Sequence, residues 1–127
     1  SNIHVFKYVP QVKVLEIADV FITHGGMNSI SEAMVTKTPM LVIPFASDQY
    51  VNADCVIKLN AGKKIQLKEL TSNTLNRLAL SIINDYSIKE SLKKTNKMIE
   101  NSLGNKGGAK LIIDFYEKEK LNERTID

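Results

Sequence analysis

Apolar residues along this chain occur either in unbroken runs or at the spacing of one helix face, and these two patterns predict the elements. Runs of apolar and β-branched residues without alternation occur at 20–23 and 40–44, a pattern typical of parallel strands buried on both faces. Between them, Ile30, Ala33 and Met34 recur at the spacing of one helix face. This succession of strand, helix and strand predicts an α/β fold: a Rossmann-like parallel sheet with helices on both faces.

Apolar spacing and stop signals divide the rest of the chain into further elements. Asn60-Ala61-Gly62 is a good stop for the helix after the second strand, and Thr71-Ser72 caps the most regular amphipathic helix. In chain order we expect a β-rich segment over 3–9 and then a short helix from Pro10, with Val12, Val14, Leu15 and Ala18 as its apolar positions. The unit over 20–44 follows, and after it a helix through Leu59 and an edge strand over 64–66. The last expected elements are helices over 72–83, 88–103 and 109–120.

Composition and charge narrow the class of protein. The 127 residues, 43% hydrophobic and 24% charged, suit one globular domain. A net charge of +3, with lysines spread among acidic neighbours, indicates neither a nucleic-acid surface nor a membrane surface. Cys55 is the only cysteine and is expected to be a buried thiol; the absence of a disulfide, a signal peptide and a bilayer-length apolar run favours a cytoplasmic setting. His4 and His24 have no metal-ligand spacing, so no metal site is expected.

The first strand ends at His24-Gly25-Gly26, where candidate chemistry begins. Two glycines let the backbone turn tightly and approach a ligand closely. The helix that follows opens with Met27-Asn28-Ser29, and its unpaired N–H groups stand just past the turn. A helix start of this kind attracts anions.

Each polar residue near these turns also has a purely structural interpretation. Ser29-x-x-Glu32 fits a capping box, Asp48 fits an N-cap ahead of the next helix, and His24 fits a strand-end histidine bonded to backbone. Their joint placement favours a site, because His24 and Asp48-Gln49 both follow the carboxyl ends of consecutive parallel strands. That edge is where open α/β sheets bind ligands.

The longer pattern resembles the donor-binding motif of nucleotide-sugar-dependent glycosyltransferases with two facing Rossmann-like domains, the GT-B fold. Among these it is similar in particular to bacterial macrolide glycosyltransferases and to plant and animal UDP-glycosyltransferases. The matched residues are Tyr8-Val9-Pro10-Gln11, His24-x-Gly26-x-Asn28-Ser29-x-x-Glu32, Pro44 and Asp48-Gln49. The resemblance implies that residues 1–121 are the donor-binding C-terminal domain of such an enzyme, without its first strands. Because chain ends are often poorly ordered, we expect 122–127 to be a frayed tail.

The resemblance also implies a role for each matched residue. Tyr8, in place of the tryptophan usual in plant members, would stack on the nucleobase, and the backbone of Val9 would read the base edge. The other residues divide by ligand group: Gln11 and Glu32 for the ribose, His24, Gly26, Asn28 and Ser29 for the diphosphate, and Asp48 and Gln49 for the donor sugar. A carboxylate beside a pyrophosphate suits ribose hydroxyls, which favours UDP, and the last pair suits a hexose such as glucose.

The implied function is inverting transfer of a hexose from a UDP-sugar, the donor substrate, to a hydroxyl of a small-molecule acceptor, with no cofactor. In such enzymes the catalytic base and the acceptor contacts belong to an N-terminal domain, so we expect no catalytic residue here and no turnover by this chain alone. One alternative is a stand-alone nucleotide-sugar-binding subunit that completes its site with a partner chain. Another is an epimerase of the same fold, but Asp48 alone does not supply the acid and base carboxylates that it needs.

A final expectation concerns the edge of the sheet. By resemblance to the strand order 3-2-1-4-5-6, the segments 3–9, 20–23 and 40–44 are the third, fourth and fifth strands, so the first two are missing. The strand at 20–23 then has an open apolar edge. Either 3–9 pairs with it, giving a four-stranded monomer, or a second molecule does. We expect the second outcome, a homodimer.

Overall fold

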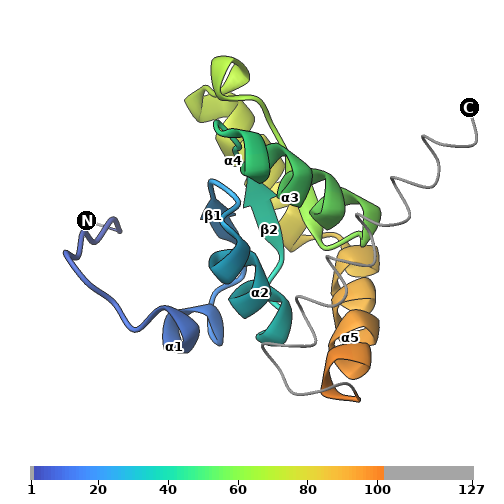
Figure 1. Ribbon diagram of the computed structural model, residues 1–127. Helices are drawn as coiled ribbons and strands as arrows, with labels where there is room; N and C mark the ends of the chain where they lie inside the picture. Colours follow the sequence, from blue (N-terminus) through green and yellow to red (C-terminus); the bar gives the residue numbers. More distant parts are fainter. Residues whose placement is uncertain (1, 102–127) are drawn as a thin grey trace, which may run out of the picture.

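The fold is a parallel sheet between layers of helices, and the computed structural model describes it over residues 2–101 (Figure 1). The sheet has three strands in the order β1-β2-β3: β1 (Phe21–Thr23), β2 (Met40–Val42) and β3 (Gly62–Lys64). The helices are α1 (Gln11–Leu15), α2 (Met27–Val35), α3 (Ser47–Lys58), α4 (Ser72–Ile83) and α5 (Tyr86–Glu100), and a 3₁₀ turn, η1 (Leu67–Glu69), precedes α4. The predicted α/β class is therefore confirmed.

Parallel pairing places the carboxyl ends of the three strands at one edge of the sheet. Phe21 pairs with Met40, and Met40 pairs with Gly62, so the strands are in step. Successive crossovers in one direction put α2 and α3 on the same face of the sheet. Figure 1 shows these two helices in front and α4 behind, where α4 contacts β2 and β3. The loops that follow β1 and β2 consequently meet at the carboxyl edge.

The middle strand is the centre of the core. All three residues of β2 are fully buried, because helices cover both of its faces. The predicted inner face of α2 is confirmed by the burial of Ile30, Ala33 and Met34, and the thiol of Cys55 is buried as predicted. The prediction of burial on both faces was wrong for β1. Its Ile22 is 44% exposed: among the described residues β1 is an edge strand, and α4, the helix behind the sheet, contacts β2 and β3.

Residues 2–9 form no strand, which corrects the prediction for 3–9. The segment is exposed, with Val5 at 92% and Phe6 at 68%, and Figure 1 shows it leaving the body of the domain. A β-rich pattern gives a strand only where another strand pairs with it. The sheet of the described residues ends at β1, so the four-stranded arrangement does not form.

The first helix is shorter and less buried than predicted. It begins at Gln11, with Pro10 as its N-cap, and ends at Leu15. Leu15 is its only buried residue, whereas Val12 and Val14 are exposed. The prediction that Val12 and Val14 are inward apolar positions was wrong, because a helix of five residues makes little more than one turn and buries only Leu15.

The stop signal predicted at Asn60-Ala61-Gly62 is confirmed, and its first residue ends α3. Asn60 adopts the left-handed conformation, with a φ of 51°, and it ends the helix. Gly62 instead belongs to β3, where a Cβ would lie 1.9 Å from the carbonyl oxygen of Met40. The edge strand therefore begins at Gly62 rather than at 64, because only glycine lets the chain pass this close to β2.

The two long helices after the sheet have well-defined starts. Thr71 caps α4 as predicted, its Oγ1 accepting from the N–H of Thr74 at 3.1 Å. Asp85 caps α5, which begins at Tyr86, two residues earlier than predicted. The predicted end of that helix near Leu103 and Gly104, the helix over 109–120 and the tail over 122–127 lie outside the described residues, so the domain boundary at 121 stays a prediction.

Candidate functional site

The loop between β1 and α2 is a tight turn built around Gly25. This residue has a φ of +96°, the left-handed region that L side chains rarely adopt. A Cβ here would lie 2.8 Å from Cγ1 of Val42. The N–H of Gly25 donates to Oγ1 of Thr23 at 3.2 Å. Both the backbone conformation and the available space therefore require glycine at this position.

The histidine of the turn is held through one ring nitrogen. The N–H of Gly26 donates to Nδ1 of His24 at 3.1 Å, so the expected bond from His24 to backbone is present. When the ring is neutral, its proton is consequently on Nε2, which can donate to a ligand. Gly26 is the N-cap of α2, and no side chain among the described residues caps this helix. The amides of 27–29, including that of the exposed Asn28, are available to an anion.

The capping-box interpretation of Ser29 and Glu32 is wrong. Ser29 lies within α2, because the helix begins two residues earlier, at Met27. Instead, Nε2 of Gln11 donates to Oγ of Ser29 at 3.2 Å and to Oε2 of Glu32 at 2.8 Å. One amide group thus joins two side chains on adjacent turns of α2 and links this helix to α1. The ionised carboxylate keeps further acceptor positions for a ligand.

At the start of α3, Gln49 provides the cap that we expected from Asp48. Oε1 of Gln49 accepts from the N–H groups of Phe45 at 3.0 Å and of Ala46, the N-cap, at 3.1 Å. The N-cap prediction for Asp48 was wrong because α3 begins at Ser47. Asp48 is exposed in the first turn, where its negative charge suits the helix dipole. Its carboxylate and Nε2 of Gln49 have no hydrogen-bond partner within the described residues.

The two helix starts lie side by side, as expected for loops that follow neighbouring parallel strands. A Cβ on Gly25 would lie 3.4 Å from the carbonyl oxygen of Gln49. The rings of His24 and Phe45 meet edge to face, with their centroids 5.8 Å apart. The turn at 24–26 and the first turn of α3 therefore form one continuous surface at the carboxyl edge of the sheet.

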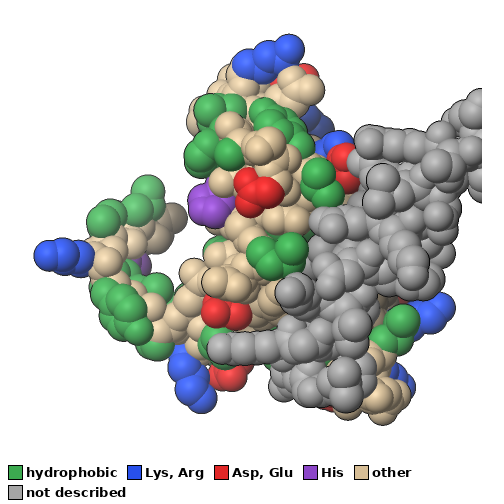
Figure 2. All heavy atoms as spheres, in the orientation of Figure 1, with side chains coloured by type: hydrophobic (Ala, Val, Ile, Leu, Met, Phe, Trp, Pro, Cys, Tyr) green, Lys and Arg blue, Asp and Glu red, His purple; other side chains and the backbone are tan. Residues whose placement is uncertain are grey.

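Two of the predicted residues are not brought to this edge. Tyr8 and Val9 lie on the segment 2–9, and their side chains are 84% and 37% exposed. Figure 2 shows hydrophobic side chains gathered on the segment that leaves the body at the N-terminus. The structure thus brings Gln11 together with Ser29 and Glu32, and His24 together with the start of α3. Tyr8, the residue predicted to stack on the nucleobase, lies apart from both groups.

One residue at this edge was missed by the sequence prediction. Asn52 on α3 is only 2% exposed, and its Nδ2 donates to the carbonyl oxygen of Gly25 at 2.9 Å. The pattern held a signal for it, because Asn52 precedes Cys55 and Val56 by three and four positions and both of these are buried. A polar residue on the inner face of a helix needs a hydrogen-bond partner.

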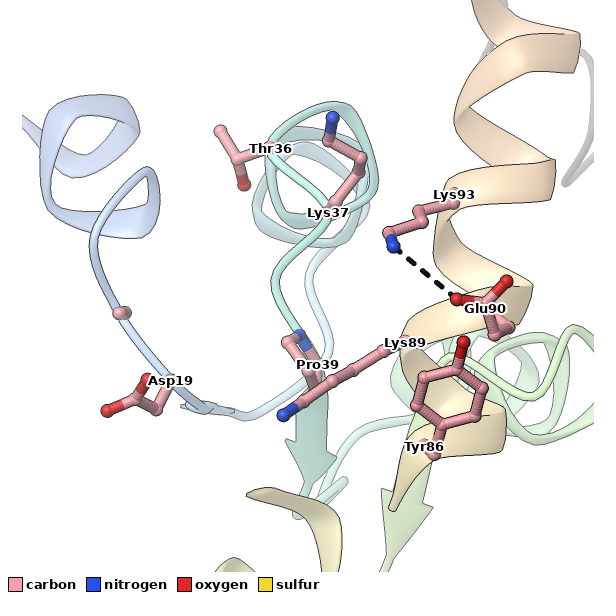
Figure 3. Close-up of a pocket in the computed structure, with 9 residues that line it drawn as sticks. Asp19, Thr36, Lys37, Pro39, Tyr86, Lys89, Glu90 and Lys93 are labelled. Carbon is pink, nitrogen blue, oxygen red and sulfur yellow. Dashed lines mark hydrogen bonds and ion pairs between the residues drawn. The ribbon is translucent and has the colours of Figure 1, made fainter. Parts of the chain in front are cut away.

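The opposite edge of the sheet carries a pocket of about 340 Å³ (Figure 3). It lies between α5 and the loops that lead into β1 and β2, represented by Asp19 and Pro39. Its charged walls are lysines and two carboxylates, and Nζ of Lys93 pairs with Oε1 of Glu90 at 3.4 Å. The pocket shares no residue with the set predicted from the sequence.

Among residues 2–101, no group of three or more His, Cys, Asp or Glu side chains is placed to hold a metal ion. No helix in the same range is long and apolar enough to span a membrane.

Comparison with known proteins identifies the family. Residues 1–101 match the family model described as UDP-glucoronosyl and UDP-glucosyl transferase. The chain is 40% identical over 119 residues to the uncharacterized UDP-glucosyltransferase YojK of Bacillus subtilis, and 33% identical over 119 residues to the oleandomycin glycosyltransferase of Streptomyces antibioticus. Each alignment covers 94% of this chain. The chain belongs to the UDP-glucoronosyl and UDP-glucosyl transferase family.

Solved structures agree with this assignment. The glycosyltransferase of kitacinnamycin superposes with a TM-score of 0.77 at 36% identity, over 86% of this chain and 28% of that one. A UDP-glucose:anthocyanidin 3-O-glucosyltransferase in complex with UDP gives a TM-score of 0.69 at 26% identity, over 86% of this chain and 26% of that one. The described sheet and helices are part of a GT-B fold. The chain spans 29% and 27% of the two curated relatives, less than a third of their length.

Proposed function

We propose that this chain is the donor-binding part of a glycosyltransferase that transfers a hexose from a UDP-sugar, with inversion, to a hydroxyl of a small-molecule acceptor. The observation that carries the proposal is the carboxyl edge of the sheet. There the turn at 24–26 and the uncapped start of α2 stand beside the start of α3, and farther along α2 Gln11 holds Ser29 and Glu32. Family membership supports the reaction class.

Each part of this edge suits one part of a UDP-sugar. Backbone amides at 27–29 and a donor on His24 suit a diphosphate, because charge-assisted hydrogen bonds to oxyanions are strong. A half-buried carboxylate, that of Glu32, suits the two hydroxyls of a ribose. Asp48 and the amide nitrogen of Gln49 offer an acceptor and a donor to sugar hydroxyls. The roles of Tyr8 at the base and Val9 at its edge require the segment 2–9 to close over the site.

We propose that the acceptor pocket and the catalytic base lie outside this chain. The acceptor hydroxyl must lose a proton as it attacks the anomeric carbon, and the relatives are more than three times as long as this chain. His24 is assigned to the leaving diphosphate, where it stabilises developing negative charge. The chain alone is expected to bind donor without turning it over.

Calorimetry of this chain against UDP, UDP-glucose and dTDP tests the assignment. UDP-glucose should bind at least as tightly as UDP, and dTDP should bind more weakly because it lacks the 2′-hydroxyl. Replacing His24 or Ser29 with alanine should each weaken UDP binding by about tenfold or less. Lys89→Gln in the pocket of Figure 3 is the matched control and should change nothing. If Lys89→Gln bound UDP more weakly and the other two variants bound it unchanged, the nucleotide would bind at the opposite edge of the sheet, where the amino ends of the strands lie (the amino edge). That result would overturn the proposal.

We also propose that the chain associates with a second copy through β1. The N–H of Phe21 and the carbonyl of Thr23 bond toward β2, so by alternation the N–H and carbonyl of Ile22 face the open edge. The side chain of Ile22 is 44% exposed there. Sedimentation at tens of micromolar should show a dimer, and Ile22→Lys should give a monomer because a charge at an edge opposes strand pairing. A monomeric parent contradicts this part.

A further inference from the structure

Asn52 is the polar side chain most completely enclosed near the carboxyl edge. It lies one and a half turns into α3, it is 2% exposed, and it donates to the carbonyl oxygen of Gly25 at 2.9 Å. Twenty-seven positions separate the two residues, so the bond is purely tertiary. Burying an amide is favourable only when it is hydrogen-bonded. This bond therefore restrains the positions of both the Asn52 side chain and the carbonyl group of Gly25.

The bond fixes the direction of one peptide group. A trans peptide points its C=O and its N–H in opposite directions. With the oxygen of Gly25 turned toward Asn52, the N–H of Gly26 must point away from α3, and there it meets Nδ1 of His24 at 3.1 Å. Thr23 holds the other side of Gly25 by accepting from its N–H. Because glycine flanks this peptide on both sides, little else restricts its rotation.

The consequence reaches the histidine ring. An N–H directed at Nδ1 requires that nitrogen to be the acceptor, so the neutral ring keeps its proton on Nε2. Without Asn52 the peptide between Gly25 and Gly26 can rotate, the bond to Nδ1 is lost, and the proton can occupy either nitrogen.

We propose that Asn52 is a positioning residue for the diphosphate end of the donor site. Through the Gly25–Gly26 peptide it holds His24 with Nε2–H as the donor and keeps the amides at the start of α2 facing the ligand. This inference rests on the proposed function. It adds a residue that does not contact the ligand but fixes the orientation of the groups that do.

The chain contains a matched control. Asn96 on α5 is 6% exposed, and its Nδ2 donates to the carbonyl oxygen of Val35 at 2.8 Å, at the far end of α2. Asn96→Ala therefore removes the same kind of buried bond, with a comparable loss of stability, away from the carboxyl edge. A role that is only structural predicts the same binding behaviour for Asn52→Ala and Asn96→Ala.

The first measurement is calorimetry of the 127-residue chain against UDP and uridine, which lacks the phosphates. The parent should bind UDP more tightly than uridine. Asn52→Ala should lose about tenfold in UDP affinity with no change for uridine, the loss expected for one charge-assisted bond. Asn96→Ala should keep both affinities. A parent that does not prefer UDP contradicts the proposed function, whereas an Asn52→Ala chain that keeps the full preference overturns the role of Asn52.

The second measurement needs no ligand. Ring ¹⁵N chemical shifts report which nitrogen of a neutral histidine carries the proton, and His4 is the only other histidine. His24 should be protonated on Nε2 in the parent and in Asn96→Ala, and it should be a mixture of tautomers in Asn52→Ala. If the alanine variant does not fold, Asn52→Leu replaces it, because leucine has a similar size and no group that can donate to the carbonyl of Gly25. A single Nε2 tautomer in the folded Asn52 variant overturns the inference.

Discussion

The two edges of the sheet present opposite kinds of surface. The amino edge has a pocket of about 340 Å³ whose charges are carried by long, exposed side chains such as Lys89 and Lys93. The carboxyl edge has helix starts and short polar groups that hydrogen bonds hold in place, as Gln11 holds Ser29 and Glu32. Under the proposed function, the fixed dipoles of the carboxyl edge, and not this pocket, receive the anion. A cleft there requires a second wall, which the longer relatives have the length to supply.

The largest expected effect comes from a substitution that disrupts the sheet, on which both edges depend. Gly62→Ala places a Cβ 1.9 Å from the carbonyl oxygen of Met40, and backbone of the central strand cannot move aside cheaply. We expect a loss of about 3 kcal/mol or more in the free energy of unfolding, or no folded protein. Urea denaturation measures it. An unchanged unfolding midpoint would show that β3 does not pack as described.

The next largest effect comes from substitutions at two residues with a left-handed backbone conformation, one at each edge of the sheet. Gly25→Ala should cost about 1–2 kcal/mol of stability and should weaken UDP binding more than tenfold, because the turn must open to hold a Cβ. Lys37, at the amino edge, has a φ of 59°. Lys37→Gly should stabilise the chain by about 0.5–1 kcal/mol and leave UDP affinity unchanged. Equal changes in UDP affinity in the two variants would show that the two edges do not differ in nucleotide binding.

A smaller effect separates ribose recognition from packing. Glu32→Gln keeps the size of the side chain and an oxygen that can accept from Gln11, but it weakens acceptance from hydroxyls. We expect about fivefold weaker UDP binding, equivalent to one hydrogen bond of about 1 kcal/mol, and little change in melting temperature. Binding of 2′-deoxyuridine diphosphate should fall less. Equal losses for both nucleotides would exclude the 2′-hydroxyl as the partner of Glu32.

The smallest effect concerns α5, which forms a wall of the amino-edge pocket. Hydrogen bonds from the hydroxyl of Ser87 and the N–H of Ile88 lower the pKa of Asp85, the N-cap of this helix. A lowered folded-state pKa gives stability that is present above the ordinary pKa near 3.8 and is lost as the pH falls below it. The melting temperature should therefore drop below pH 4 more steeply in the parent than in Asp85→Asn. UDP binding at pH 7 should be equal in both.

Local patterns predicted the centre of the molecule well. The unbroken apolar run at 40–44 and the spacing of Ile30, Ala33 and Met34 correctly gave the buried strand and the inner face of α2. These features depend on residues a few positions apart, and every one of them concerns the burial of apolar surface. The turn at 24–26 was also expected, because a pair of glycines after a strand has few other uses.

Tertiary contacts account for what the sequence did not predict. The segment 3–9 has a β-rich composition, but a strand depends on a partner that the described residues do not provide. The bonds from Gln11 to Ser29 and Glu32 join positions 18 and 21 apart, and the bond of Asn52 spans 27. Capping was assigned to Ser29 and Asp48 because cap preferences do not fix a helix start to within two residues.

Titration of the ¹⁵N-labelled chain with UDP, followed by amide chemical shifts, tests most directly whether the nucleotide binds at the carboxyl edge. The account predicts the largest shift changes at 24–29, at Glu32 and at 47–49, with little change at Lys37, Lys89 and Lys93. Changes concentrated at those three lysines, with the turn at 24–26 unaffected, would contradict it.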